Sequence, residues 1–165
     1  MDRPLWAPWR MEFIAAEKPK GCIVCDYPAA PAAEDRRNLI VHRGEHAFVI
    51  LNRYPYNSGH LMVVPRRHGA DLAALPPGEY AELMEEVRVA AAVLQATYRC
   101  EGINVGMNLG KAAGAGIVDH LHWHLVPRWV GDNNFMPVLG DIRVMVDHLD
   151  TTWEKVRAGY AARAP

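Results

Sequence analysis

Three histidines alternate with large apolar residues in the segment His-Leu-His-Trp-His-Leu-Val at residues 120–126. Side chains of a β-strand point alternately to its two faces. The spacing therefore predicts a strand over residues 118–126 with His120, His122 and His124 on one face and the apolar residues buried on the other. A face made of imidazoles gives up apolar packing, which favours a functional use over a structural one.

Size and charge limit the classes of protein that this chain can be. It has 165 residues, 50% hydrophobic and 22% charged, as expected for one globular domain. The net charge of −1 offers no basic field for long nucleic acid, although a small anionic ligand needs only local donors. No apolar run reaches the roughly 20 residues of a membrane helix, and the N-terminus lacks the apolar core of a signal peptide. We therefore expect no membrane partner and a cytoplasmic location.

Hydrophobic periodicity predicts an α+β domain. The expected strands lie at residues 39–42, 47–51, 60–64, 103–107 and 142–146, in addition to the histidine strand. The expected helices lie at residues 79–99 and from a capping box at 151–154 to about residue 162. The expected loops lie at residues 26–38, 110–116 and 130–140. Tight early connections favour a mainly antiparallel sheet with helices packed on it.

Three kinds of chemistry could use the histidine row. These are a zinc enzyme with several histidine ligands, a non-haem iron site with two histidines and a carboxylate, and nucleophilic attack on phosphorus by an imidazole. Asp119 would point to the opposite strand face, which weakens the iron reading. The glycine-rich segment 110–116, with Lys111, could supply backbone donors and a cation to phosphate oxygens.

The residues of the row fit the histidine triad pattern without a mismatch. Residues 47–52, 58–65, 104–108 and 126–128 also resemble the histidine triad (HIT) superfamily, in its usual order. The resemblance implies a HIT-like α+β fold with a roughly five-stranded antiparallel sheet, one long helix and one C-terminal helix, commonly paired as a homodimer. It implies a single domain over residues 1–165, in which 1–38 form an N-terminal extension, 39–130 the core and 131–165 a C-terminal segment.

The resemblance also implies an activity, which is attack at the α-phosphorus of a nucleotide such as a dinucleoside polyphosphate. His122 matches the family's nucleophile, which carries the nucleotidyl group covalently and passes it to water or phosphate. His124 would contact the phosphate and help the leaving group, and His60 would support the row. Asn52 matches a position that contacts the nucleoside, and Asn108 one near the phosphates.

Gly116 is the departure that bears on the acceptor. Many members of the family carry glutamine at this position, where it helps to bind phosphate. Residues 114–120, 5–11 and 127–129 here resemble instead a bacterial branch often labelled diadenosine tetraphosphate phosphorylase. That branch uses inorganic phosphate as acceptor, for which the small Gly116 could leave room. The alternatives are a hydrolase of nucleoside phosphoramidates or aminoacyl adenylates, and a nucleotide-binding regulatory protein. The intact triad argues against the last, because binding alone needs no nucleophile.

A second candidate site begins with Cys22-Ile23-Val24-Cys25, a spacing that suggests metal or redox chemistry. Together with His68 and His120, it resembles the structural zinc site of several triad proteins and of galactose-1-phosphate uridylyltransferase. Two thiolates and two imidazoles suit tetrahedral zinc. His120 would then be a ligand, and the site would tie the N-terminal segment to the histidine row. Trp129 and residues 132–134 are further candidates for lining the active site.

Overall fold

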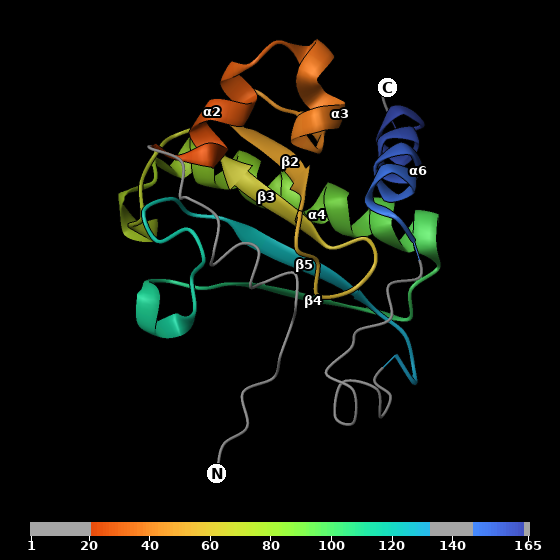
Figure 1. Ribbon diagram of the computed structural model, residues 1–165. Helices are drawn as coiled ribbons and strands as arrows, with labels where there is room; N and C mark the ends of the chain where they lie inside the picture. The colour runs from red at the N-terminus through yellow and green to blue at the C-terminus, as the bar shows by residue number, and fades with distance from the viewer. Residues whose placement is uncertain (1–20, 133–146, 164–165) are drawn as a thin grey trace.

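The described part of the sheet has five antiparallel strands, as the family resemblance implies. In the computed structural model, which describes residues 21–132 and 147–163, they run in the order β1-β2-β3-β5-β4 (Figure 1). The strands are β1 (Ile40–Arg43), β2 (Ala47–Leu51), β3 (Leu61–Pro65), β5 (Trp123–Arg128) and β4 (Gly102–Met107). The α+β class and the antiparallel sheet are confirmed.

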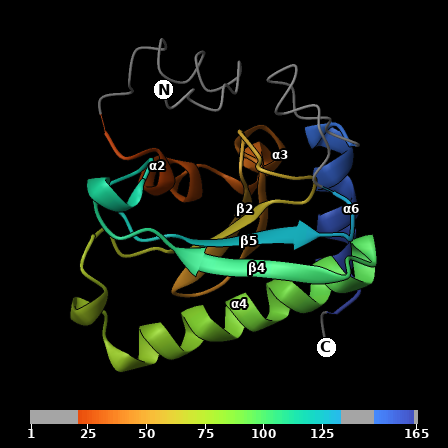
Figure 2. The ribbon, with the colours of Figure 1, turned by 90° about the horizontal axis from the view of Figure 1, so that it is seen from below.

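Helices pack on both sides of this sheet. The long α4 (Pro77–Tyr98) packs on β2, β3 and β5, and α6 (Leu149–Ala161) packs on α4 and β1. Figure 2 shows α4 on one side of the sheet and the short α2 (Ile23–Ala29) on the other. Every residue of β2 and β3 is buried, so the core lies along these two central strands. Within the described residues, no helix is long and apolar enough to cross a membrane.

The predicted long helix is confirmed as α4. Sequence could predict it because the signals that define it act over a few neighbouring residues. Proline at the start suits the first turn of a helix, where backbone N–H groups have no partner within the helix. One face buries apolar side chains against the sheet: Leu83, Val87, Ala90, Val93 and Leu94. The helix ends before Arg99, which takes a left-handed conformation (φ 48°) and donates its N–H to the carbonyl of Gln95.

The expected loop at residues 26–38 is wrong, since it contains most of α2, a short 3-10 turn (Ala32–Glu34) and the four-residue α3 (Asp35–Asn38). A seven-residue helix with an internal proline is unstable alone. Tertiary contacts stabilise α2. Val24 is buried in the core, and the Arg43 guanidinium donates to the carbonyls of Pro28 (2.7 Å) and Ala30 (3.0 Å) at its C-terminal end.

The last helix begins earlier than the capping box predicts. Its N-cap is His148, whose ring accepts from the Asp150 N–H, and Thr152 is buried inside the first turns of α6. The box at 151–154 is therefore not the cap. The expected strand at 142–146 lies outside the described residues.

The histidine row is not one strand face. Because β5 starts at Trp123, His120 and His122 precede it, and residues 120–122 are buried in succession. The Leu121 N–H donates to the Gly69 carbonyl (2.8 Å) and not to the sheet. The orientations of His120 and His122 are therefore set by separate hydrogen-bond partners of each ring and not by the pleat of one strand.

Candidate active site and metal centre

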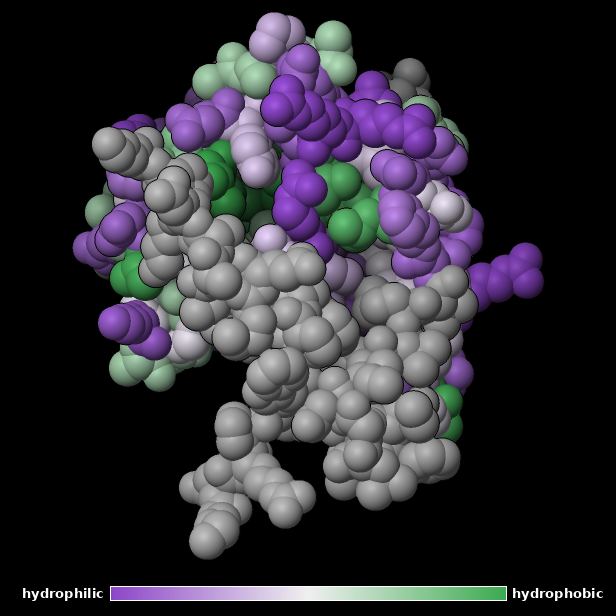
Figure 3. All heavy atoms as spheres, viewed as in Figure 1, coloured by the Kyte–Doolittle hydropathy of each residue, from purple (hydrophilic) through white to green (hydrophobic). Residues whose placement is uncertain are grey.

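A cavity of about 270 Å³ opens beside the triad, between α2, β2 and the turn at residues 114–117. One part of its wall is apolar and includes Ile23, Val24, Tyr27, Leu39, Ile50, Met62 and Ile117. The polar part includes Asn38, Asn52, Arg53, His122 and His124. Figure 3 shows hydrophobic residues recessed between hydrophilic ones on the face that carries α2. Such a cavity suits a flat, mostly apolar ring with a polar extension.

One hydrogen bond defines the tautomer of His122. Its Nδ1 lies 2.8 Å from the carbonyl oxygen of His120. A carbonyl only accepts, so in the neutral ring Nδ1 carries the hydrogen and Nε2 keeps its lone pair. The ring is 3% exposed yet lines the cavity. Nε2 therefore has a lone pair that could act as a nucleophile, and the backbone carbonyl two residues earlier in the chain holds the ring in this tautomer.

His60 and His124 form a second hydrogen-bonded chain. The backbone N–H of Tyr56 donates to Nδ1 of His60 (3.0 Å), which leaves the hydrogen of the neutral His60 on Nε2. That atom lies 2.9 Å from Nδ1 of His124, so His124 carries its own hydrogen on Nε2. These two hydrogen bonds leave Nε2–H of His124 as a donor at the cavity wall.

Burial keeps this pair neutral. Desolvation, with smaller effects from His124 and His122, lowers the pKa of His60 to about 3. Desolvation and His122 lower the pKa of His124 to about 4. The rings of His122 and His124 meet edge to face at 4.9 Å, and those of His60 and His124 lie 5.1 Å apart. The structure thus brings the three predicted catalytic side chains together.

The predicted nucleotide-binding residues differ in their placement. Asn52 lines the cavity, and its Oδ1 accepts from the Tyr54 N–H (2.9 Å), which leaves its amide hydrogens for a ligand. Gly116 lines it too, and apart from its chain neighbours no atom of the described residues lies within 4 Å of the position that a Cβ would take. Asn108 is not among the lining residues. It follows directly after β4, whose last pair with β5 is Met107 with Trp123.

The four predicted metal ligands form a cluster in which all ligand atoms lie within 4.8 Å of one another. Nδ1 of His120 is 3.3 Å from Sγ of Cys22 and 3.4 Å from Sγ of Cys25. Sγ of Cys25 is 3.4 Å from Nδ1 of His68. Tetrahedral zinc with ordinary bond lengths places its sulfur and nitrogen ligands about 3.5–3.8 Å apart. The donor set and its spacing therefore fit zinc.

One further observation on the cluster agrees with a bound cation. His120 Nε2 lies 2.8 Å from the Pro65 carbonyl, which assigns its hydrogen to Nε2 and leaves the lone pair on Nδ1 for the metal. Without a cation, burial and the neighbouring Cys22 raise the pKa of Cys25 to about 11. A dication would reverse this effect, because coordinating thiols are deprotonated.

Other parts of the site were not predicted correctly or at all. Neither Trp129 nor Asp132 lines the cavity. Trp129 packs edge-on against Tyr98, with 6.3 Å between ring centroids. Asp132 accepts hydrogen bonds from Arg128 and Asn57. Residues 133 and 134 lie outside the described part. Two features near the catalytic histidines were not predicted from the sequence: Tyr27 in the cavity wall and the backbone N–H of Tyr56 that binds His60. A helix beginning at the cysteines could have indicated Tyr27, but no sequence signal identifies a backbone donor.

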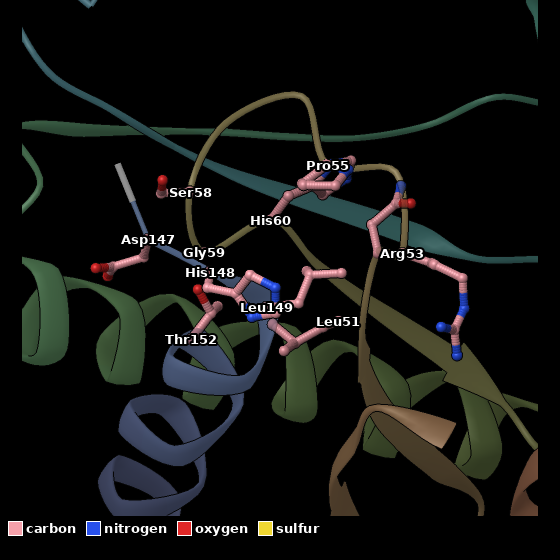
Figure 4. A pocket seen from close by; sticks show the side chains of 11 residues that line it. Leu51, Arg53, Pro55, Ser58, Gly59, His60, Asp147, His148, Leu149 and Thr152 are labelled. Atoms are coloured by element: carbon pink, nitrogen blue, oxygen red, sulfur yellow. The ribbon is translucent and has the colours of Figure 1, made fainter. Parts of the chain in front are cut away.

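A second cavity, of about 450 Å³, lies between the loop at residues 52–60 and the start of α6 (Figure 4). Its lining includes Ser58, His60, His148 and Thr152. Of the three histidines predicted to be catalytic, only His60 lines it, and neither His122 nor His124 does. The candidate chemistry therefore belongs to the first cavity.

Comparison with known proteins agrees with this geometry. The family model described as HIT domain matches residues 34–130. A Mycobacterium tuberculosis protein named AP-4-A phosphorylase is 41% identical over 98% of this chain and 85% of its own length. A Schizosaccharomyces pombe protein named bis(5'-nucleosyl)-tetraphosphatase [asymmetrical] is 30% identical over 56% of this chain and 50% of its own.

The solved structures include a zinc-bound histidine triad family protein from Mycobacterium smegmatis. The two proteins share 27% sequence identity and superpose with a TM-score of 0.67. The match covers 86% of this chain and 94% of the M. smegmatis chain. The sheet, the clustered histidines and these matches agree, and the chain belongs to the histidine triad (HIT) family.

Proposed function

We propose that this protein cleaves dinucleoside polyphosphates through a covalent nucleotidyl intermediate on His122. The observation that carries the proposal is the hydrogen bond from His122 Nδ1 to the His120 carbonyl (2.8 Å), which leaves an imidazole lone pair at the cavity wall. The M. tuberculosis relative named AP-4-A phosphorylase, 41% identical over nearly the whole chain, supports the substrate class.

The residues of the cavity suggest how the reaction proceeds. A base packs against the apolar wall, with the ribose near Asn52 and the α-phosphorus near His122. Nε2 forms a nitrogen–phosphorus bond while the bond from phosphorus to the bridging oxygen breaks, and the polyphosphate leaves. The Nε2–H of His124 donates to a phosphate oxygen as negative charge shifts to the leaving group. The His120 carbonyl continues to accept from Nδ1 of the now cationic ring.

The acceptor then attacks phosphorus and restores His122. The open space at Gly116 and the printed name of the M. tuberculosis relative support inorganic phosphate, which would release a nucleoside diphosphate. Water in the same place would release a monophosphate. Asn108, which directly follows the β4 residue paired with Trp123, is the proposed amide near the phosphates.

We also propose that zinc binds Cys22, Cys25, His68 and His120. The donor set and the zinc-bound M. smegmatis neighbour support this assignment. When bound, the metal supplies a structural cross-link and no step of the reaction. It joins the start of α2, whose Ile23 and Val24 line the cavity, to the backbone that orients His122.

The free edge of the sheet supports a homodimer. Strand β4 ends the strand order and pairs only with β5 in the described sheet. Val105 on β4 and Leu109 just after it are each 49% exposed. An apolar edge with unpaired backbone groups favours pairing with another strand, and we propose a second copy of this chain as that partner.

Product analysis tests the proposed activity. The protein is incubated with diadenosine tetraphosphate, with and without phosphate, and separately with adenosine phosphoramidate, and the products are separated by chromatography. We expect ADP and ATP when phosphate is present. AMP as the only product besides ATP under those conditions would contradict a phosphorylase, and turnover of the phosphoramidate alone would support the alternative hydrolase. No turnover of any substrate would support a binding protein.

A further inference from the structure

The loop between β2 and β3, residues 52–60, is held in its middle by one amide side chain. Nδ2 of Asn57 donates to Oδ2 of Asp132 (3.0 Å) and to the carbonyl of Pro127 (3.1 Å). Oδ1 of Asn57 accepts from the Ser58 N–H (3.0 Å). The loop that carries Asn52 and His60 is therefore tied to the end of β5, far away in the chain.

Asp132 is a rigid attachment for this loop. Its carboxylate accepts from Nε (2.6 Å) and Nη2 (2.7 Å) of Arg128 and from the N–H of Trp129 (3.1 Å). Two parallel bonds to one guanidinium restrict the geometry strongly. The same bonds lower the pKa of Asp132 to about 2, so it accepts as an anion at neutral pH. Its side chain is 10% exposed.

The backbone on each side of Asn57 holds His60. The His60 N–H donates to the carbonyl of Asn57 (3.2 Å), and the N–H of Tyr56 donates to Nδ1 of His60 (3.0 Å). At Gly59, with φ +80°, a Cβ would lie 2.9 Å from Tyr98, so the loop has little room to shift. Figure 4 shows His60 at the end of this loop, above the start of α6.

We propose that Asn57 and Asp132 are positioning residues for the reaction proposed above. They hold the Tyr56 N–H against His60, and this donor determines which nitrogen of His124 presents a hydrogen to the substrate. Neither residue lines the nucleotide cavity, so they act on the reaction through His60 and not by contact with the nucleotide. The inference rests on the proposed function, because it assigns to His124 the role of donor to phosphate.

The consequence of a loosened loop follows from the tautomers. If the Tyr56 N–H moves away, His60 can carry its hydrogen on Nδ1 and present a lone pair to His124. Nδ1 of His124 must then carry the hydrogen, and its Nε2 presents a lone pair to a phosphate oxygen. Two acceptors facing each other repel, so the chemical step slows while nucleotide binding stays nearly unchanged.

The test compares Asn57→Ala and Asp132→Asn with the wild-type protein in kinetics and in long-range ¹H–¹⁵N spectra of the imidazoles. We expect kcat to fall roughly 10–100-fold with KM changed less than about twofold, as for other residues that orient a catalytic group. The spectra should show His60 and His124 as Nε2–H tautomers in the wild type and as mixtures in the variants. Asn104→Ala is the control, since it removes another partner of Arg128 (2.9 Å) and leaves the Asn57–Asp132 bond in place.

Two results would overturn the inference. A folded Asn57→Ala protein with wild-type kcat and unmixed tautomers would show that the loop tie does not position His60. A fall in kcat with unchanged tautomers and a raised KM would assign the tie to binding. If Asn57→Ala does not fold, the same measurements on Asp132→Asn decide, because that variant conserves the side-chain size but replaces one acceptor oxygen by an –NH2 group, which cannot accept from Arg128 or Asn57. Wild-type turnover in the same assay separates either result from failure of the proposed function.

Discussion

The carbonyl oxygen of His120 lies 2.8 Å from Nδ1 of His122, and the ring of the same His120 faces the thiols of Cys22 and Cys25. One residue thus takes part in two sites. Its side chain belongs to the candidate metal centre, and its backbone assigns the tautomer of the proposed nucleophile. Order in one site is therefore expected to support order in the other.

Loss of the metal should weaken nucleotide binding. Cys25→Ser removes a ligand, and α2, which carries Ile23 and Val24 in the cavity wall, loses its N-terminal attachment. We expect the zinc content to fall from about one ion per chain to almost none, and the Kd for AMP to rise roughly tenfold, about 1.4 kcal/mol. Metal analysis and calorimetric titration check both, with Cys100→Ser, which is outside the cluster, as control. Full zinc content in Cys25→Ser would contradict the ligand assignment.

Acid should destabilise the protein through His60. Its pKa is about 3 when folded and near 6.5 when unfolded, so the unfolded chain binds more protons between these values. The free energy of unfolding therefore falls as pH drops below 6.5, by about 1.4 kcal/mol from this ring at pH 5.5. Urea unfolding at pH 7.5 and 5.5 should show a loss larger by about 1.4 kcal/mol in wild type than in His60→Asn, which keeps the loss due to His124 and whose amide oxygen can still accept from Tyr56. An equal loss in both proteins would contradict the prediction.

Gly159 allows α6 to lie close to α4. A Cβ there would lie 2.8 Å from Oγ1 of Thr97 and 2.9 Å from Cγ1 of Val93. Gly159→Ala should lower the free energy of unfolding by about 1–3 kcal/mol through overpacking and leave kcat unchanged. Gly78→Ala is the matched control, because among the described residues no atom outside its own helix backbone and chain neighbours lies within 4 Å of its Cβ position, and alanine favours a helix. Thermal unfolding of both variants measures the difference in their unfolding temperatures. Equal shifts of the unfolding temperature in the two variants would contradict the prediction.

The edge strand β4 should carry the dimer contact. Val105→Glu places a charge on an exposed apolar position and should shift the protein from dimer to monomer. Analytical ultracentrifugation over a concentration series measures the change, and Arg88→Ala, an exposed position on α4, controls for the altered charge. A dimer that survives Val105→Glu would place the interface elsewhere.

Local patterns predicted most of the fold but not its tertiary details. The helix at Leu83 and Val87 and the hairpin of β1 and β2 follow from periodicity and turns, which act over a few residues. Helix α2 depends on buried Val24 and on Arg43, which lies beyond the reach of any local signal. The start of β5 was predicted too early because Leu121 gives its N–H to Gly69, a contact across the fold.

The candidate site shows the same division. The residue types of His60, His122 and His124 and of the four metal ligands could be read from the sequence through its resemblance to the family. The tautomers could not, because they depend on the carbonyl of His120 and the N–H of Tyr56. The loop tie between Asn57 and Asp132 joins residues with no shared motif, so it required the structure.

Trapping the intermediate tests the central claim most directly. The protein is mixed with excess diadenosine tetraphosphate without phosphate, quenched in alkali, which preserves nitrogen–phosphorus bonds, and digested for mass spectrometry. The account predicts an adenylyl group on His122, and it predicts that His122→Ala forms none and loses at least about 10³-fold in kcat. An adenylyl group on another residue, or steady turnover by His122→Ala at the wild-type rate, would contradict it.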